Sequence, residues 1–378
     1  MNNLNENLPL FEKNQEKKEY FRNPNIDFIR IFGMLVIVIH HFLFHGKAMV
    51  KYKSYIKLRL LNIICTWHVG SFGVISGIVG NNKSHKYSNL LYLWIITVFY
   101  LLLFYLKNNI FKTHIIRYNF ISLIFPVIHN KYWYFSSYFG IYPFLPFINT
   151  SISYIPQITF KKSVYFMISI FIIWASCYGD VFSQNSGHSP FSLLIFYIFG
   201  KYIGKYIFYI KHGTRYRILI CMICIVIFIS ISLLSYNIYI KNYCPYFNPR
   251  IKNIFHVAIN SFPMLLQVIS FTIFSAQLRF NNFFSRVLNF IGPLTFDVYL
   301  IHDNPYIRNT YISLFFNKYS SNLNILIVFL LIIKGSFYIF GISIFIGYIR
   351  NKIFRFIKIK ELCITFETII TKIIYYLI

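Results

Sequence analysis

The sequence predicts an all-α integral membrane protein, a polytopic bundle of about ten transmembrane helices. Hydrophobic residues make up 57% of the 378 residues and charged residues only 12%, and a soluble domain could not bury that much apolar surface. Apolar runs of roughly twenty residues, the length that crosses a bilayer as a helix, recur from end to end. The expected surroundings of the chain are therefore a lipid bilayer.

The apolar runs divide into ten expected spans at residues 26–45, 60–80, 88–107, 131–150, 162–178, 190–210, 217–237, 254–277, 287–303 and 324–349. An even number of spans places both termini on one side of the membrane. Lys and Arg are more numerous in the loops and tails of that side than on the other. By the positive-inside rule, both termini are expected to be cytoplasmic.

The chain is expected to form one membrane domain between two tails. Residues 1–25 are polar and rich in Asn, Glu and Lys, which predicts a mobile tail, and residues 351–378 form a basic, amphipathic C-terminal tail. Between them, residues 26–350 contain no long Pro, Gly or Ser linker and no repeat of fixed period. No small-residue cleavage site follows the first span, so we expect a retained helix in a multi-pass protein of the plasma membrane.

The net charge of +27 does not indicate a nucleic-acid partner, because Lys and Arg are scattered through short loops and helix ends instead of forming a compact basic domain. Membrane anchoring is the expected use of these charges. Cys221 and Cys224 form a CxxC pair inside an apolar run, where thiols usually behave as small hydrophobes, and no metal site is expected.

The first span contains a pair of ionisable residues, Arg30 and His41, eleven residues apart. At about 100° per helical residue both side chains return to one face, three turns apart, whereas His40 points about 100° away. An ionisable side chain in a membrane helix costs on the order of 2.5–3.5 kcal/mol or more, so the pair indicates a functional site. Asp27, three residues before Arg30, is placed to hold its guanidinium.

A second group of polar residues is expected in the same leaflet as His41. The ninth span begins on the cytoplasmic side and carries His302 and Asp303 toward the outer half, and the fourth span begins outside with Tyr132 and Trp133. The aromatic residues fit an interfacial belt or a surface for stacking sugars equally well. Asp303 fits either an orienting partner of His302 or a solvated carboxylate.

Two further ionisable residues have structural interpretations. His68 is expected to be a core histidine bonded to a carbonyl oxygen. Lys334, in the middle of an apolar run, is expected to pair with a carboxylate such as Asp297.

Five stretches resemble, in order, the acyltransferase 3 family of membrane enzymes: NIDFIRIFGMLVIVIHH (25–41), FGVISG (72–77), YSNLLYLWIITVFY (87–100), FPVIHNKYWYFSSYFGIYPFLPFIN (125–149) and FDVYLIHDNP (296–305). The first contains the family's Arg, ten residues, then His, and the second its Phe-x-x-x-Ser-Gly turn. The YWYF and YLIHDNP segments are similar to the polysaccharide-modifying branch. Two features depart from the family pattern. His40 lies directly beside His41. The hydrolase-like extracytoplasmic domain that some members append is not seen in this sequence, which implies a membrane domain that works alone or with a separate partner.

The resemblance implies an O-acyltransferase that moves an acyl group, acetyl above all, from acyl-CoA to a hydroxyl of a glycan or another extracytoplasmic acceptor. His41 would be the general base, since an imidazole with an ordinary pKa near 6.5 suits that task. Arg30 would pair with CoA phosphate, supported by Asp27. Ser76 and Gly77 would break or tighten the second helix beside the thioester. Acyl-CoA is expected as the donor substrate, with no tightly bound cofactor.

A transporter or flippase is the alternative, with the buried Arg, His and Asp residues forming a proton or substrate pathway. Secondary transporters usually show repeated halves with interrupted helices in corresponding places. No such repeat is visible, although prolines interrupt several spans. Uptake into vesicles without an acyl donor would favour transport, and donor-dependent release of free CoA would favour the enzyme.

The predicted topology is testable by cysteine labelling. A cysteine placed at Asn185 should react with an impermeant reagent added from outside, because the loop that contains it is expected to be extracytoplasmic. A cysteine placed at Lys83 should react only after the membrane is permeabilised. The reverse pattern would invert the protein and remove the separation of donor and acceptor sides.

Overall fold

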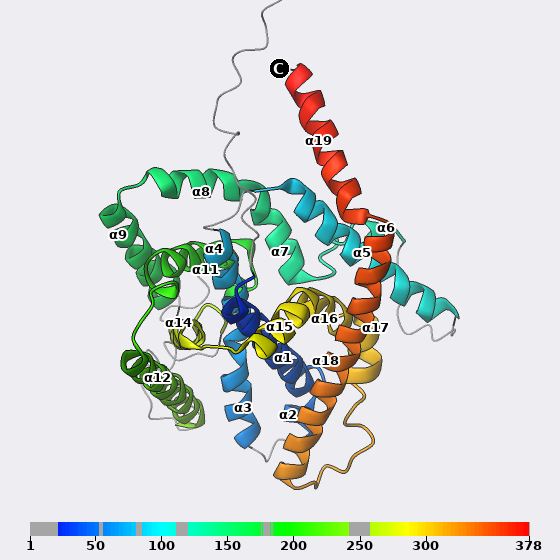
Figure 1. Ribbon diagram of the computed structural model, residues 1–378. Helices are drawn as coiled ribbons and strands as arrows, with labels where there is room; N and C mark the ends of the chain where they lie inside the picture. The colour runs from blue at the N-terminus through cyan, green and yellow to red at the C-terminus, as the bar shows by residue number, and fades with distance from the viewer. Residues whose placement is uncertain are drawn as a thin grey trace, which may run out of the picture.

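The computed structural model describes residues 22–52, 56–80, 85–110, 120–174, 176, 182, 184–241 and 258–377. Every regular element in these ranges is helical, as predicted. Helix α1 (Pro24–Phe44) begins after Asn23, whose side chain accepts a hydrogen bond from the Asn25 amide, and Pro24 occupies the first helical turn. In Figure 1, α1 runs through the middle of the bundle. The predicted tail at 1–25 lies mostly outside the described residues.

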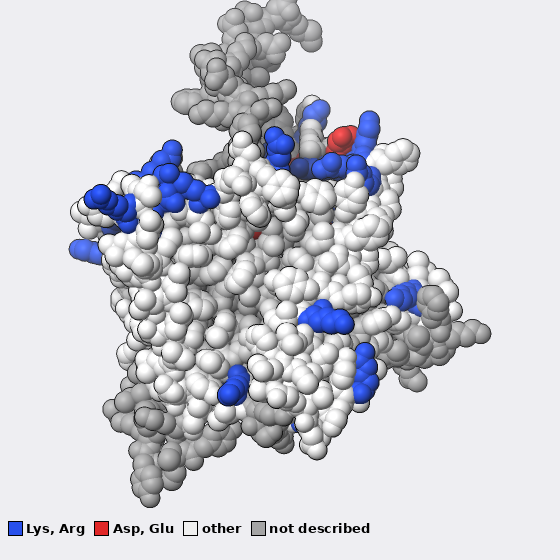
Figure 2. Space-filling view, turned by 60° about the horizontal axis from the view of Figure 1, so that its bottom comes forward, with Lys and Arg blue, Asp and Glu red and all other residues white. Residues whose placement is uncertain are grey.

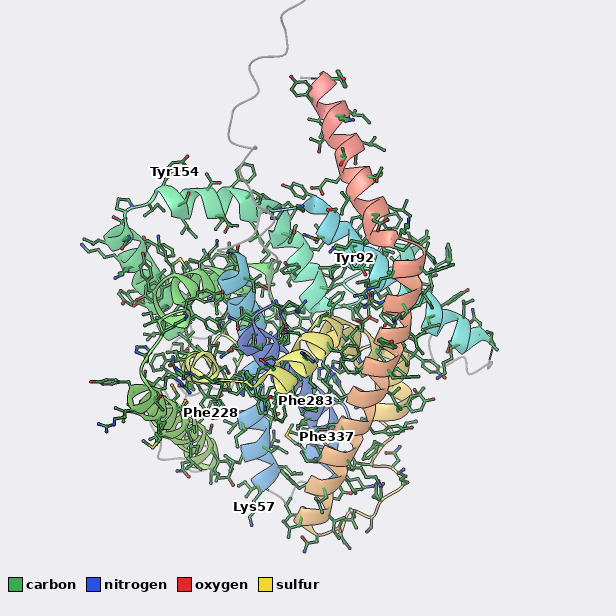
Figure 3. The ribbon with its side chains drawn as sticks, in the orientation of Figure 1. Lys57, Tyr92, Tyr154, Phe228, Phe283 and Phe337 are labelled. Carbon is green, nitrogen blue, oxygen red and sulfur yellow. The ribbon has the colours of Figure 1, made fainter. Side chains whose placement is uncertain are left out.

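The N-terminal half continues through α2 (Ala48–Lys51), α3 (Lys57–Thr66), α4 (His68–Gly80), α5 (Tyr87–Ile110), α6 (Phe120–Ile124), α7 (Trp133–Ile141), α8 (Leu145–Tyr154) and α9 (Gln157–Ile168). The C-terminal half contains α11 (Pro190–Ile203), α12 (Thr214–Lys241), α14 (Phe262–Gln277), α15 (Asn282–Ile291), α16 (Thr295–His302), α17 (Pro305–Ile307), α18 (Ile325–Phe356) and α19 (Ile359–Leu377). Lys57 and Tyr154 lie at opposite ends of the molecule (Figure 3).

Six helical stretches in the described part of the chain are long and apolar enough to cross a bilayer: Pro24–Lys51, Lys57–Gly80, Tyr87–Ile110, Pro190–Phe208, Thr214–Ile238 and Ile325–Phe356. This supports a multi-pass membrane protein, but the predicted count of ten spans is not confirmed.

Prolines explain why two of the other expected spans are divided. Pro143 lies in a short 3-10 turn between α7 and α8, and Pro293 lies in another between α15 and α16. A proline has no backbone N–H and its ring clashes with the preceding helical turn, so a continuous helix does not form there. The cytoplasmic position of both termini remains a prediction.

Helix α1 is the centre of packing, with α3, α4, α14, α15, α16 and α18 around it. Helix α4 is fixed in turn by a close crossing with α11. A Cβ atom at Gly77 would collide with the backbone of Tyr197, and one at Gly200 would collide with the backbone of Val74. Small residues at such crossings let two membrane helices approach backbone to backbone. Ser76 and Gly77 are expected to break or tighten α4. A break is wrong, because the helix is continuous there, and Gly77 serves the crossing.

A buried ion pair joins α16 to α18. Arg350 donates from Nε to Asp297 Oδ1 at 2.9 Å and from Nη2 to Asp297 Oδ2 at 2.6 Å. The Tyr100 hydroxyl of α5 donates to the same carboxylate at 2.7 Å, and Tyr92 of α5, labelled in Figure 3, accepts a bond from Arg350 Nη1 at 3.1 Å. The predicted pairing of Asp297 with Lys334 is therefore wrong, because Arg350 takes that place and Lys334 is exposed.

The C-terminal helix α19 projects beyond the bundle and reaches back to the start of α5 (Figure 1). The Glu367 carboxylate accepts hydrogen bonds from the backbone amides of Tyr87 at 2.7 Å and Ser88 at 3.0 Å, so it caps the first turn of α5 from another helix. Burial acts to raise the pKa of this carboxyl, but the hydrogen bonds outweigh burial and lower the pKa.

The charged surface agrees with a membrane setting. In Figure 2, Lys and Arg gather at one end of the visible face, where an acidic side chain also lies. Only isolated basic residues and one small acidic spot interrupt the broad uncharged area below. Large apolar side chains such as Phe337 and Tyr338 of α18 are more than half exposed, as expected for a surface that faces lipid.

Replacing Arg350 with Met should lower the free energy of unfolding by about 3–5 kcal/mol, because it leaves a buried carboxylate without its partner. The melting temperature of the purified protein in detergent measures this. The matched control, Lys334→Met, removes an exposed charge from the same helix and should leave the melting temperature nearly unchanged. Adding Asp297→Asn to Arg350→Met should recover part of the loss, and equal stability of Arg350→Met and the parent protein would contradict the assignment.

Candidate active site

A cavity of about 280 Å³ follows α1 between Arg30 and His41. Its walls come from α1, α4, α5, α7 and α16 with its C-cap, through Arg30, Met34, Ile37, His41, His68, Val69, Phe72, Ser76, Leu93, Trp133, Tyr134, Phe135, Tyr138, Thr295, Phe296, Tyr299 and Asp303. The two ends are polar and the middle is mostly apolar and aromatic. At a rise of 1.5 Å per residue the two α1 residues are about 16 Å apart along the helix axis.

Arg30 forms one end of the cavity, and it belongs to a group of three charged residues of which the other two lie outside the cavity wall. Arg30 Nη1 donates to Asp27 Oδ1 at 2.9 Å, as the spacing predicts. Arg22, which the sequence reasoning did not select, also binds Asp27, from Nε at 2.8 Å and from Nη2 at 2.6 Å. Asp27 is only 1% exposed. Two guanidinium groups thus share one carboxylate, and the excess positive charge suits an anionic ligand.

His41 forms the opposite end with Asp303. His41 Nδ1 lies 3.8 Å from Asp303 Oδ1, within ion-pair range but longer than a hydrogen bond. Arg308 Nη1 lies 3.3 Å from the same oxygen and holds the carboxylate in place. Asp303 is thus no solvated loop residue, since it is buried and faces His41 as well as Arg308.

His302 lies behind His41 and outside the cavity wall. The two ring centres are 4.8 Å apart, and His302 Nδ1 is 2.6 Å from the Val298 carbonyl oxygen. Because a carbonyl only accepts, Nδ1 carries the proton in the neutral ring, and Nε2 is a buried acceptor without a hydrogen bond among the described residues. His302 therefore adds an acceptor beside His41.

The other two histidines of this region differ in position. His68 contacts the Cys65 carbonyl through Nδ1, as predicted, and it also lines the cavity. His40 packs against His68 with ring centres 5.4 Å apart and is not part of the cavity wall. His41 and Arg30 thus share a face that His40 does not, in agreement with the helical periodicity.

The remaining predicted site residues have mixed positions. Trp133 lines the cavity, and Ser76 lines it while its hydroxyl donates to the Phe72 carbonyl at 2.9 Å. Tyr132 is 1% exposed; its hydroxyl donates to Leu300 O at 2.9 Å and accepts from Asn304 Nδ2 at 2.9 Å. Tyr132 therefore fixes the start of α7 against the end of α16.

His41, His45 and Asp303 are close enough for their ligand atoms to lie within 4.8 Å of one another, a spacing able to hold a metal ion. The positive charge of Arg308 reaches the same Asp303 oxygen and opposes a second cation there.

The sequence reasoning did not select three cavity tyrosines, Tyr134, Tyr138 and Tyr299. Tyr299 precedes Asp303 by four residues and so shares its helical face, a signal present in the sequence. Tyr134 and Tyr138 are likewise four residues apart and share one face of α7, but only the structure shows that this face lines the cavity.

The fold and the site define a multi-pass helical membrane protein with a guanidinium and an imidazole in one cavity. The model of the acyltransferase 3 family, described as an acyltransferase domain, matches residues 23–363, and the chain belongs to this family. It is thus a membrane acyltransferase. Comparison with curated proteins and with solved structures gives no match.

Proposed function

We propose that the protein transfers an acyl group, acetyl above all, from acyl-CoA to a hydroxyl of a glycan on the outer side of the plasma membrane. The observation that carries the proposal is the single cavity that Arg30 and His41 both line. It connects a fixed positive charge with a base through an apolar passage. An anionic donor with a long neutral arm and a reactive thioester fits that arrangement.

Arg30 binds the donor in this proposal. Coenzyme A is a polyanion, and a guanidinium binds phosphate through parallel hydrogen bonds. Asp27 holds Arg30 in place and is itself bound by Arg22, so this end of the cavity keeps a net positive charge. The pantetheine arm then lies along Met34, Ile37 and the apolar wall of α4.

His41 is the general base. Asp303 faces Nδ1, which favours the tautomer with the proton on Nδ1 and leaves Nε2 free to accept a proton. The acceptor oxygen attacks the thioester carbonyl carbon as its proton passes to Nε2. The carbon–sulfur bond then breaks, and the leaving CoA sulfur takes that proton back from His41.

The acceptor enters beside α7 and α16. Trp133 offers an aromatic face to a sugar ring, and Asp303 lines the adjacent wall. Tyr132 and His302 support that wall from outside the cavity. Sugar hydroxyls find an acceptor in the Asp303 carboxylate. This end of the cavity therefore offers both stacking and hydrogen bonding to a glycan.

Replacing Arg30 with Lys should weaken acetyl-CoA binding about tenfold or more, since losing one charge-assisted hydrogen bond costs about 1.5–3 kcal/mol. Calorimetry or a displacement assay on the purified protein measures the dissociation constant. Arg286→Lys is the matched control, because Arg286 is exposed and outside the cavity. Unchanged donor affinity in the Arg30 variant would leave Arg30 as a membrane anchor only.

Replacing His41 with Ala should lower turnover about 10²- to 10⁴-fold at normal protein level, the usual cost of losing a positioned general base. His40→Ala should retain most activity, because His40 lies outside the cavity wall. Donor-dependent release of CoA, together with mass spectrometry of surface glycans, reports turnover. An inactive His40 variant with an active His41 variant would exchange the two roles, and uptake without any acyl donor would favour a transporter.

A further inference from the structure

The buried Tyr299 hydroxyl has no acceptor for its proton in the described part of the chain. The residue is 6% exposed and lines the cavity. Its neighbours Tyr132 and Tyr100 are buried as well, but their hydroxyls donate to Leu300 O and Asp297 Oδ1. Leaving a buried donor without an acceptor costs free energy, so this exception indicates a group that waits for a ligand atom.

The position of Tyr299 places it at the reacting end of the cavity. It lies one helical turn before Asp303 on the same face of α16, and Asp303 faces His41. Its ring centre is 6.3 Å from that of His302, which in turn packs on His41 at 4.8 Å. The hydroxyl, the proposed base and the orienting carboxylate therefore border one small volume.

The start of α7 opens onto the same volume. The helix has nine residues, and its N-cap, Tyr132, makes no capping hydrogen bond through its side chain. The amides of the three residues before Ser136 have no helical acceptor, and two of them, those of Tyr134 and Phe135, lie against the Tyr299 oxygen. Those residues, Trp133, Tyr134 and Phe135, all line the cavity, and the Tyr134 ring lies 6.2 Å from that of Tyr299. A helix start of this kind favours negative charge.

We infer that Tyr299 is a catalytic residue whose hydroxyl, with its oxygen held against the first amides of α7, donates to and stabilises the oxyanion of the acyl-transfer intermediate. The inference rests on the proposed function. When the acceptor oxygen bonds to the thioester carbonyl carbon, the carbonyl π electrons move to its oxygen, and Tyr299 Oη donates a hydrogen bond to it. When the carbonyl re-forms and the CoA sulfur leaves, that charge and the extra stabilisation disappear together.

The test replaces Tyr299 with Phe, which keeps the ring and removes only the hydroxyl. With acetyl-CoA as donor and glycans extracted from cells that lack the protein as acceptor, kcat should fall about 10²- to 10³-fold, the usual cost of one oxyanion donor. The KM values of donor and acceptor should change little. The melting temperature should not fall, because the substitution removes a buried donor that has no acceptor.

The matched control is Tyr197→Phe. Tyr197 is also buried, but its hydroxyl donates to Asn149 and lies outside the cavity, so kcat should stay near the wild-type value. This control separates loss of an oxyanion donor from loss of any buried tyrosine hydroxyl.

The outcomes separate this inference from the proposed function. Normal kcat in Tyr299→Phe beside an active wild type and an inactive His41→Ala would overturn the oxyanion role alone. A raised acceptor KM at normal kcat would also overturn it and assign the hydroxyl to acceptor binding. If the wild type itself releases no CoA with acetyl-CoA and the glycan extract, the proposed function and the inference fall together.

Discussion

The buried ion pair between Asp297 and Arg350 is the constraint on which the reacting end of the cavity depends. α16 is only two turns long, too short to be held by its own backbone hydrogen bonds. The ion pair ties it to the long α18, and Tyr100 ties the same carboxylate to α5. Because Tyr299 and Asp303 lie on α16 and at its C-cap, their positions relative to His41 follow from this anchor.

The two ends of the cavity differ in chemistry: one carries excess positive charge, and the other carries buried acid, base and hydroxyl groups. Near Arg30, two arginines share one carboxylate, and the excess positive charge favours an anionic ligand. Near His41, buried carboxylate, imidazoles and a hydroxyl without an acceptor occur together. Burying these polar side chains together lowers the stability of the protein without substrate. A substrate that supplies the missing hydrogen-bond partners would offset this loss. Helix α1 is rigid and passes both ends, so it fixes their separation.

Local periodicity allowed the pairing of Arg30 with His41, the contact of Asp27 with Arg30 and the exclusion of His40 to be predicted, since all three depend on one helix. Partners from distant parts of the chain were not predictable in the same way. Arg350 follows Asp297 by 53 residues, and only packing shows that it displaces Lys334 as the partner. The number of spans was not predictable for a similar reason. The length of an apolar run predicts one continuous helix, but the structure divides two such runs at Pro143 and Pro293.

The crossing of α4 and α11 has an evolutionary consequence. Gly77 and Gly200 each face the backbone of the other helix, so neither contact has a side chain that a second substitution could shorten to make room. A larger residue at either position cannot be accommodated by a compensating change opposite it, only by moving a whole helix that carries part of the cavity wall. Neither glycine can therefore be replaced by a larger residue during evolution, while the lipid-facing residues of the same helices remain free to vary.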